Sequence, residues 1–205
     1  MAAHPTHVLG LSGSLRPGSN TAHAVDLALS GAAEAGVIVE RLDLGALDLP
    51  FCGMPDAGDR AGTRRLRQAV SQAHGLIIGT PEYHGSCSGV IKNALDLLGF
   101  DECQGKLVGL VGTAGGDLAA VSALQELRNI SRSLHMWVVP SQAGVPRSRS
   151  AFTPTGELND ARLVARLRGV GREVAHFATL HHDRDWRRFL VAWEKSVANP
   201  GGQHD

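Results

Sequence analysis

Residues 8–21 read VLGLSGSLRPGSNT, and this stretch decides the fold class. Its first four residues form the short apolar run that is typical of a buried strand. Serine and glycine then interrupt the run over residues 12–19, and residues 21–35 place apolar side chains with the period of an amphipathic helix. A buried strand, a glycine-rich turn and a helix together form the opening unit of an α/β fold.

The same unit recurs along the chain. The alternation predicts strands at 8–11, 37–42, 75–79, 106–111 and 135–139, and helices at 21–35, 63–73, 88–98, 118–134 and 159–180. Pro140 is expected to stop the fifth strand, and long loops are expected at 44–62 and 141–157. Short apolar strands between helices indicate a parallel sheet covered on both faces. Residues 1–181 are therefore predicted to form one α/β domain, a three-layer, doubly wound five-stranded sheet.

A different pattern begins at residue 182. Apolar side chains recur there at helical spacing, at Trp186, Phe189, Leu190, Trp193 and Val197. Residues 182–205 are predicted to contain an amphipathic helix and then a disordered end. The helix is expected to pack on its own domain or on another subunit.

The composition excludes several classes of protein. The 205 residues include 20 Lys and Arg against 20 Asp and Glu, and this neutral balance disfavours a nucleic-acid binder and an acidic electron carrier. The three cysteines lack the spacing of a disulfide framework or a zinc finger, so no metal site is expected. Because no basic leader and no membrane-length apolar run is evident, a cytoplasmic protein without a membrane partner is predicted.

Polar residues fill the turn after the first predicted strand. Backbone N–H groups at a helix start form an anion site, and Ser14, Ser19, Asn20 and Thr21 add donors while Arg16 adds a fixed charge. Ser19-Asn20 stands where a Walker A loop needs Lys-Ser/Thr, and a dinucleotide glycine fingerprint is absent. The turn is therefore predicted to be a cup for one terminal phosphomonoester.

Two further turns are expected at the same sheet edge. In the commonest order of five strands, 2-1-3-4-5, strands 1 and 3 flank the switch point where ligands bind. The turn at 80–89 would then face the cup, with Tyr83 beside an aromatic ring and exposed N–H groups at 82–86 along its polar edge. The turn at 113–116 is small enough for its backbone to approach a flat ligand.

These paired motifs resemble a known family. Residues 13–20 (GSLRPGSN), 81–86 (PEYHGS) and 92–96 (KNALD) are similar to the NADPH-dependent FMN reductases, which include chromate, azo and quinone reductases. The resemblance covers roughly residues 6–180 and implies a flavodoxin-like fold. His84 stands where many members carry Asn, and Pro17 where Lys is frequent. The cofactor contacts that the turns and the resemblance indicate are Ser12, Ser14, Arg16, Ser19, Asn20, Thr21, Pro81, Glu82, Tyr83, His84, Gly85, Ser86, Thr113, Gly115 and Gly116.

The resemblance also implies an activity. FMN would take a hydride from NADPH or NADH and pass it to a small-molecule acceptor by a ping-pong mechanism, in a homodimer or homotetramer. The acceptor could be a quinone, free flavin, azo compound or metal oxyanion. No side chain is expected to act as a catalytic acid or base, because the flavin carries the chemistry. The alternatives are a flavodoxin-type FMN electron carrier without its own turnover and, ranked lower, a receiver-like domain.

For each of four side chains, the sequence allows both a functional and a structural interpretation. Arg147 and Arg149 are candidates for the 2′-phosphate of NADPH or are solvated loop arginines. Glu82 is a proton donor to a quinone or a solvated carboxylate, and Cys87 is a redox thiol or a small buried side chain.

Overall fold

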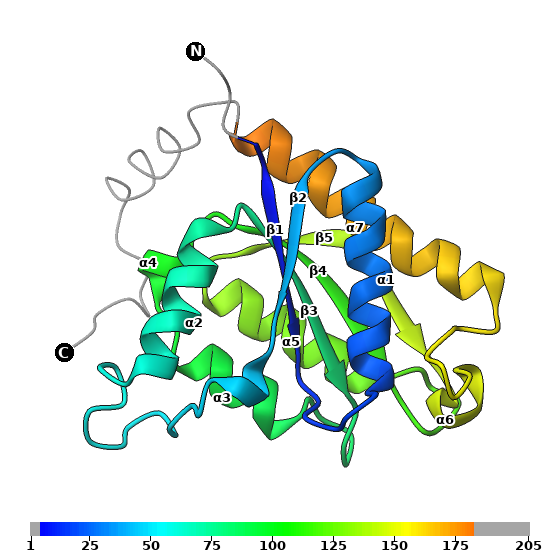
Figure 1. The fold of residues 1–205 in the computed structure, drawn as a ribbon, viewed down its shortest axis with the longest axis horizontal. Helices are drawn as coiled ribbons and strands as arrows, with labels where there is room; N and C mark the ends of the chain where they lie inside the picture. The colour runs from blue at the N-terminus through cyan, green and yellow to red at the C-terminus, as the bar shows by residue number, and fades with distance from the viewer. Residues whose placement is uncertain (1–4, 183–205) are drawn as a thin grey trace.

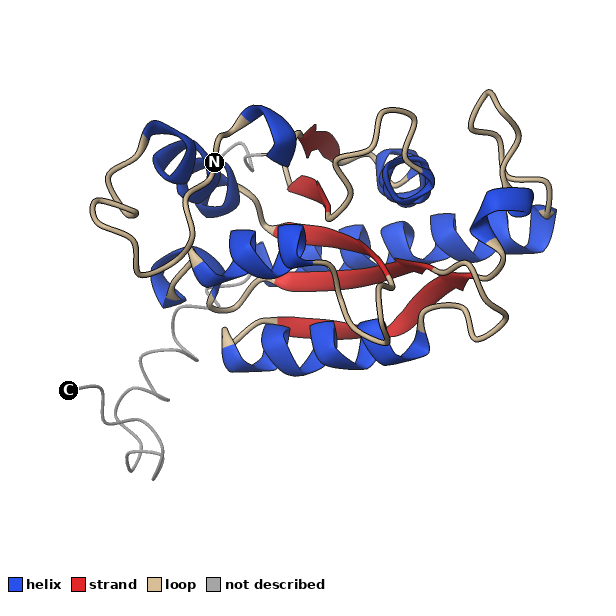
Figure 2. Cartoon of the chain, turned by 90° about the horizontal axis from the view of Figure 1, so that it is seen from below, coloured by secondary structure: helices blue, strands red, loops and turns tan. Residues whose placement is uncertain are grey.

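The computed structural model describes residues 5–182, in which one parallel sheet forms the middle layer (Figures 1 and 2). The sheet has the order β2-β1-β3-β4-β5, so the predicted fold class and strand order are confirmed. Its strands are β1 (His7–Ser12), β2 (Ile38–Leu42), β3 (Gly75–Pro81), β4 (Leu107–Thr113) and β5 (Trp137–Val145).

Helices cover both faces of the sheet. One face packs on α1 (Asn20–Glu34) and α7 (Ala161–His182), and the other packs on α2 (Ala61–Gln72), α3 (Gly89–Asp96) and α5 (Val121–Ser133). Short helices complete the described chain: η1 (Leu44–Ala46), α4 (Phe100–Cys103) and α6 (Ser148–Ala151).

The central strand β3 shows why the strands of this sheet have apolar sequences. All of its residues are buried, and its side chains alternate between the two cores, with Leu76 and Ile78 in one and Ile77 in the other. A strand that is buried on both faces has no polar side to alternate with, so its sequence is a continuous apolar run.

Strand β5 corrects the sequence prediction. It does not stop at Pro140 but continues to Val145, and the register against β4 shifts between Val108 and Leu110. Because β5 is an edge strand with β4 as its neighbour in the described sheet, a proline without an N–H can be accommodated at the irregularity. The loop predicted at 141–157 is accordingly replaced by the end of β5, by α6 and by an isolated bridge between Phe152 and Leu158.

Two smaller elements were also not predicted. The helix η1 lies inside the loop expected at 44–62, and Asp43 caps it by accepting a hydrogen bond from the Gly45 N–H at 2.9 Å. Helix α4 follows α3 before β4. The amphipathic helix and end predicted within 182–205 fall, beyond His182, outside the described residues.

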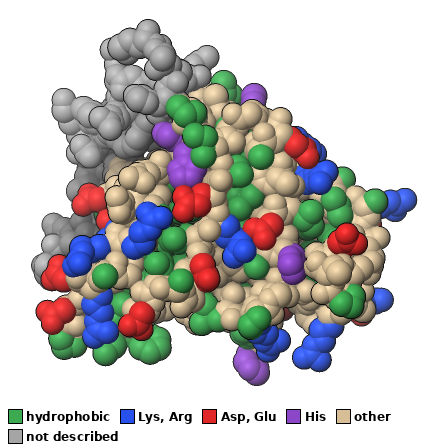
Figure 3. Space-filling model, viewed as in Figure 1, with side chains coloured by type: hydrophobic (Ala, Val, Ile, Leu, Met, Phe, Trp, Pro, Cys, Tyr) green, Lys and Arg blue, Asp and Glu red, His purple; other side chains and the backbone are tan. Residues whose placement is uncertain are grey.

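The surface shows no segregation of charge on the face seen in Figure 3, where acidic and basic side chains are interspersed. Within residues 5–182, no helix is both long and apolar enough to cross a membrane.

Candidate functional site

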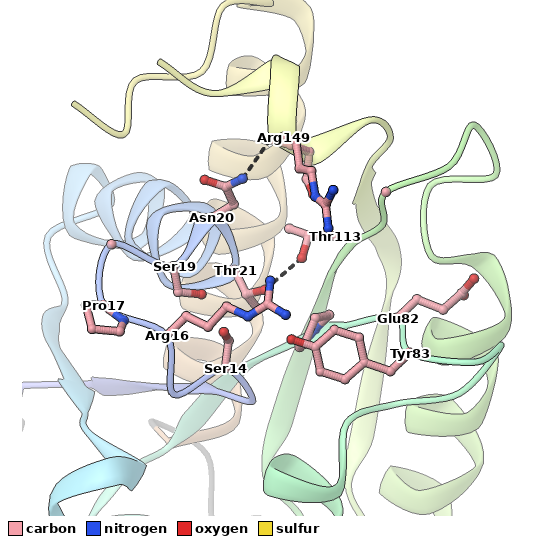
Figure 4. A pocket seen from close by; sticks show the side chains of 14 residues that line it. Ser14, Arg16, Pro17, Ser19, Asn20, Thr21, Glu82, Tyr83, Thr113 and Arg149 are labelled. Atoms are coloured by element: carbon pink, nitrogen blue, oxygen red, sulfur yellow. Dashed lines mark hydrogen bonds between the residues drawn. The ribbon is translucent and has the colours of Figure 1, made fainter. Parts of the chain in front are cut away.

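A cavity of about 490 Å³ lies at the carboxyl ends of the parallel strands (Figure 4). Its place follows from the strand order, because β1 pairs with β3 up to Ser12 and Gly79 and the turns after these strands start side by side. The volume is in the range of small-molecule sites. The cavity is lined by Ser14, Arg16, Pro17, Gly18, Ser19, Asn20, Thr21, Pro81, Glu82, Tyr83, Thr113, Gly115, Ser148 and Arg149.

The first wall is the turn between β1 and α1. Ser19 is the N-cap of α1, and its Oγ accepts a hydrogen bond from the Ala22 N–H at 3.3 Å. The turn is held against α3, because Ser88 Oγ donates to the Gly13 carbonyl at 2.6 Å and a Cβ at Gly13 would lie 2.6 Å from that Oγ. Only glycine fits there, so Gly13 fixes the path of the backbone that enters the wall.

A buried hydroxyl pair joins this wall to β4. Thr21 Oγ1 and Thr113 Oγ1 lie 2.7 Å apart, and both residues are buried. Thr21 is in the first turn of α1, where the N–H groups have no acceptor within the helix. The pair therefore sets the start of α1, with its positive dipole end, beside the end of β4.

The second wall is a two-residue hairpin. Tyr83 and Ser86 exchange backbone hydrogen bonds of 3.0 and 3.1 Å, and His84 and Gly85 both have positive φ, as in a type I′ turn. The N–H of Glu82 also donates within the protein, to the Thr113 carbonyl at 2.8 Å. Among residues 82–86, the backbone N–H groups of Glu82, Tyr83 and Ser86 donate within the protein, which leaves those of His84 and Gly85 without an acceptor in the described chain. The row of exposed donors predicted at 82–86 is therefore shorter than expected.

Two glutamates clasp this hairpin to α5. Glu82 Oε2 accepts from the Ala123 N–H at 3.0 Å in the first turn of α5. In the other direction, Glu126 Oε2 accepts from Ser86 Oγ at 2.6 Å and from the Cys87 N–H at 3.0 Å. These hydrogen bonds lower the pKa of Glu126. Glu82 is thus neither a free proton donor nor a simply solvated carboxylate, because it caps a helix.

The thiol of Cys87 lies beside the same clasp. Burial raises the pKa of Cys87, and the negative charge of Glu126 raises it further. Because the thiolate is the reactive form of cysteine, this surrounding favours the interpretation of Cys87 as an unreactive packing residue.

Residues 146–151 form an arch that is the third wall of the cavity. The prediction of a phosphate cup in the turn after the first strand did not include these residues. The Ser148 N–H donates to the Ala114 carbonyl at 2.8 Å, and Asn20 Nδ2 donates to the Ser148 carbonyl at 2.6 Å. Arg149 projects from the arch into the cavity (Figure 4). Arg147, in contrast, pairs with Asp117. The structure thus separates two arginines that the sequence could not distinguish.

Arg16 reaches across the cavity from the first wall towards the second. Its guanidinium carbon lies 5.8 Å from the centre of the Tyr83 ring, within the range of a cation–π contact. One side chain therefore spans the distance between the donor-rich turn after β1 and the aromatic ring of the hairpin.

The predicted contacts divide into two groups. The cavity brings together Ser14, Arg16, Ser19, Asn20, Thr21, Pro81, Glu82, Tyr83, Thr113 and Gly115. It does not include Ser12, His84, Gly85, Ser86 or Gly116 among its lining residues. Ser86 donates to Glu126, the Gly116 carbonyl accepts from Arg147, and Ser12 Oγ is buried without a partner in the described chain.

These walls fit a phosphorylated planar ligand. Hydroxyls, an amide, a helix N-terminus and guanidinium groups gather at one end, which is the donor set for a phosphate monoester. At the other end, a Cβ on Gly115 would meet no protein atom within 4 Å, so the space beside this glycine is open to a ligand. Among the described residues, no cluster of His, Cys, Asp or Glu side chains could hold a metal ion.

Comparisons with known proteins identify relatives of this chain. Residues 6–149 match the model of the NADPH-dependent FMN reductase family. Over 133 residues, 63% of this chain and 70% of the relative, the sequence is 40% identical to an FMN-dependent NADPH-azoreductase of Staphylococcus aureus. FerB, a flavoenzyme NAD(P)H:(acceptor) oxidoreductase from Paracoccus denitrificans, shares the fold with a TM-score of 0.70 at 24% identity, over 86% of this chain and 98% of that one. An NADH:FMN oxidoreductase shares it with a TM-score of 0.67 at 22% identity, over 97% and 94%.

Proposed function

The chain belongs to the NADPH-dependent FMN reductase family, and on that premise we propose that its cavity holds FMN and that it reduces a small-molecule acceptor in a second, separate half-reaction. The protein is an NAD(P)H-dependent oxidoreductase with FMN as its cofactor and NADPH as its co-substrate. The observation that carries the proposal is a cavity in which a turn rich in hydroxyl and guanidinium donors faces the hairpin that carries Tyr83, across the ends of β1 and β3.

The two ends of the cavity have different tasks. Ser14, Arg16, Ser19, Asn20 and Thr21 would hold the phosphate of FMN, because together they supply hydroxyl, amide and guanidinium donors at a helix start. The flavin ring would lie at the other end of the cavity, between the hairpin wall at Pro81–Tyr83 and the wall formed by Thr113 and Gly115.

When bound, FMN supplies the hydride and electron chemistry, and the protein supplies orientation. The edge of the ring site is reachable from solvent, since Tyr83 is 41% exposed. NAD(P)H and the acceptor would use this open side in turn, which gives ping-pong kinetics. The name of the Staphylococcus aureus relative supports an azo compound as one acceptor, beside a quinone, free flavin or metal oxyanion.

Steady-state kinetics test the proposal. The purified protein should be yellow, release FMN and not FAD on heating, and oxidise NADPH with an azo dye or a quinone. Parallel double-reciprocal lines are expected when both substrates are varied, and intersecting lines would contradict the two half-reactions. A flavodoxin-type carrier would show almost no turnover without a partner reductase.

A substitution of Arg16 tests the proposed position of the FMN phosphate. Arg16→Ala should weaken FMN binding by roughly 1.5–3 kcal/mol, because it removes a charge-assisted hydrogen bond to phosphate. Fluorescence titration of the flavin-free protein measures this change. Lys92→Ala, which removes an exposed cation on α3 that pairs with Asp96, is the control and should leave FMN affinity unchanged.

A further inference from the structure

We propose that Arg149 is the second cation of the phosphate end of the cavity and makes the site selective for a flavin that carries a terminal phosphate monoester. This inference rests on the proposed function, because it concerns the same cavity. According to this inference, the arch at 146–151 contributes to the selectivity of the site for FMN over riboflavin and FAD.

The arch is fixed to the phosphate end by named contacts. Asn20 is the first residue of α1 and lines the cup, and its side-chain amide donates to the carbonyl of Ser148 at 2.6 Å. On its other side, the arch is held by the Ser148 N–H on Ala114 and the Arg147 N–H on Gly116, at 2.8 and 3.0 Å. Arg149 follows directly after the residue that Asn20 holds, so its position is tied to the start of α1.

No carboxylate within residues 5–182 forms an ion pair with Arg149. In the part of the chain that the structure describes, Arg147 pairs with Asp117, but Arg149 forms no ion pair and lines the cavity opposite Arg16 (Figure 4). The one carboxylate in the lining belongs to Glu82, and it already accepts a hydrogen bond from the start of α5. A bound anion would therefore meet two guanidinium groups on opposite walls.

The charge of the ligand decides how much a second cation contributes. A phosphate monoester carries about −1.5 to −2 at neutral pH. A helix N-terminus offers roughly +0.5 and Arg16 offers one full charge, so a dianion is not fully balanced without Arg149. Riboflavin has no phosphate, and each phosphate of FAD is a diester with a single charge, so both gain less from a second cation.

The alternative ligand for Arg149 is the 2′-phosphate of NADPH. That phosphate is at the adenosine end of the coenzyme, far from the nicotinamide that must meet the flavin. Arg149 lines the same cavity as the cup and is tied to Asn20, so the geometry favours the flavin phosphate.

The experiment compares Arg149→Ala with Arg147→Ala, its neighbour on the same arch whose charge is paired with Asp117. Flavin-free protein is titrated with FMN, riboflavin and FAD by flavin fluorescence. Arg149→Ala should raise the Kd for FMN roughly 10- to 100-fold and change the Kd for riboflavin less than about twofold. Arg149→Lys should restore part of the loss, and Arg147→Ala should bind all three flavins like wild type.

A pH series adds a readout that loss of packing would not produce. The second phosphate pKa of FMN is about 6, so wild-type affinity for FMN should rise between pH 5 and pH 7.5 as the dianion forms. This rise should be smaller in Arg149→Ala and absent for FAD. The charged or titratable groups around the site are Arg16, Glu82 and Tyr83 in the lining, Arg147 and Asp117 beside the arch, and His23 and His84 nearby. All are present in both proteins, so the difference between them reports on Arg149.

Three outcomes would overturn the inference. The first is an FMN affinity in Arg149→Ala equal to that in Arg147→Ala. The second is an equal loss of riboflavin and FMN affinity, which would indicate a structural effect. The third is unchanged FMN affinity with a raised KM for NADPH but not for NADH, which would assign Arg149 to the coenzyme. If wild type itself bound no FMN, the proposed function would fail instead.

Discussion

At the scale of single residues, His84 has a backbone conformation in the hairpin wall that glycine and asparagine adopt more readily. Its φ is 54°, in the left-handed region that costs most residues about 1–2 kcal/mol, and Gly85 follows with φ 78°. Asn-Gly is the preferred pair for a type I′ turn. His84→Asn should therefore raise the free energy of unfolding by a few tenths to about 1 kcal/mol, and His84→Val should lower it by about 1 kcal/mol.

Urea unfolding followed by circular dichroism measures both changes. Because the side chain of His84 does not line the cavity, the Asn variant should keep wild-type FMN affinity. A Val variant as stable as wild type would contradict the turn conformation.

At the scale of elements, the packing of α1 on α7 depends on two glycines. A Cβ at Gly171 would lie 1.7 Å from the Ala28 carbonyl oxygen, and a Cβ at Gly31 would lie 2.1 Å from that of Arg168. These oxygens belong to helix backbones and cannot move aside alone. Gly171→Ala should therefore force the helices apart and cost about 1–3 kcal/mol of stability, as overpacking does.

Gly169 is the matched control on the same helix. A Cβ there meets nothing within 4 Å, so Gly169→Ala should stabilise the protein by up to about 1 kcal/mol through helix propensity. Thermal unfolding of the two variants should move in opposite directions. Equal shifts would mean that the close approach of α1 and α7 is not maintained in solution.

Lys106, which contacts the C-terminal end of α2, should make the free energy of unfolding depend on pH. Lys106 Nζ donates to the carbonyls of Ser71 and Ala73, and burial lowers the pKa of Lys106 to about 8. The ordinary value is about 10.4, so between pH 8 and pH 10.4 the unfolded chain binds more protons than the folded one. The free energy of unfolding should therefore rise with pH across this window, by at most about 3 kcal/mol.

Comparison with Lys106→Met isolates this contribution. The difference in unfolding free energy, wild type minus variant, should increase from pH 8 to pH 10.4 and stay constant from pH 6 to pH 7.5. A difference that does not change between pH 8 and pH 10.4 would contradict the partly buried position of the ammonium group.

The sequence could predict elements whose signals are local. The apolar run at β3 and the polar turn after β1 were enough to place two of the cavity walls, because strands 1 and 3 are neighbours in the commonest order. Pro140 was misleading, since its effect depends on β5 being an edge strand, which is a property of the whole sheet. The hydrogen bonds of Glu82 and Glu126 join residues that lie 39 to 41 positions apart in the sequence, and no local pattern marks them.

At the scale of the whole molecule, the third wall is the part of the site that sequence reasoning could not assemble. Arg149 reaches the cavity because β5 continues past the irregularity at Pro140 and places the arch beside Asn20. A strand that ended at residue 139 would have left Arg147 and Arg149 equivalent on a loop. The register of one edge strand therefore decides which arginine lines the cavity.

Apolar side chains beside the cavity lead to a prediction about assembly. Leu118 is 77% exposed and Val121 is 52% exposed on the segment that enters α5, which Glu82 ties to the hairpin carrying the exposed Tyr83. Exposed apolar patches of this kind mark interaction sites.

We expect a homodimer or homotetramer that covers this region, so Leu118→Glu should shift the protein towards the monomer in sedimentation velocity. Leu180→Glu changes a 42% exposed leucine on α7 and should leave the assembly intact. A wild-type protein that sediments as a monomer at all concentrations would contradict the expectation.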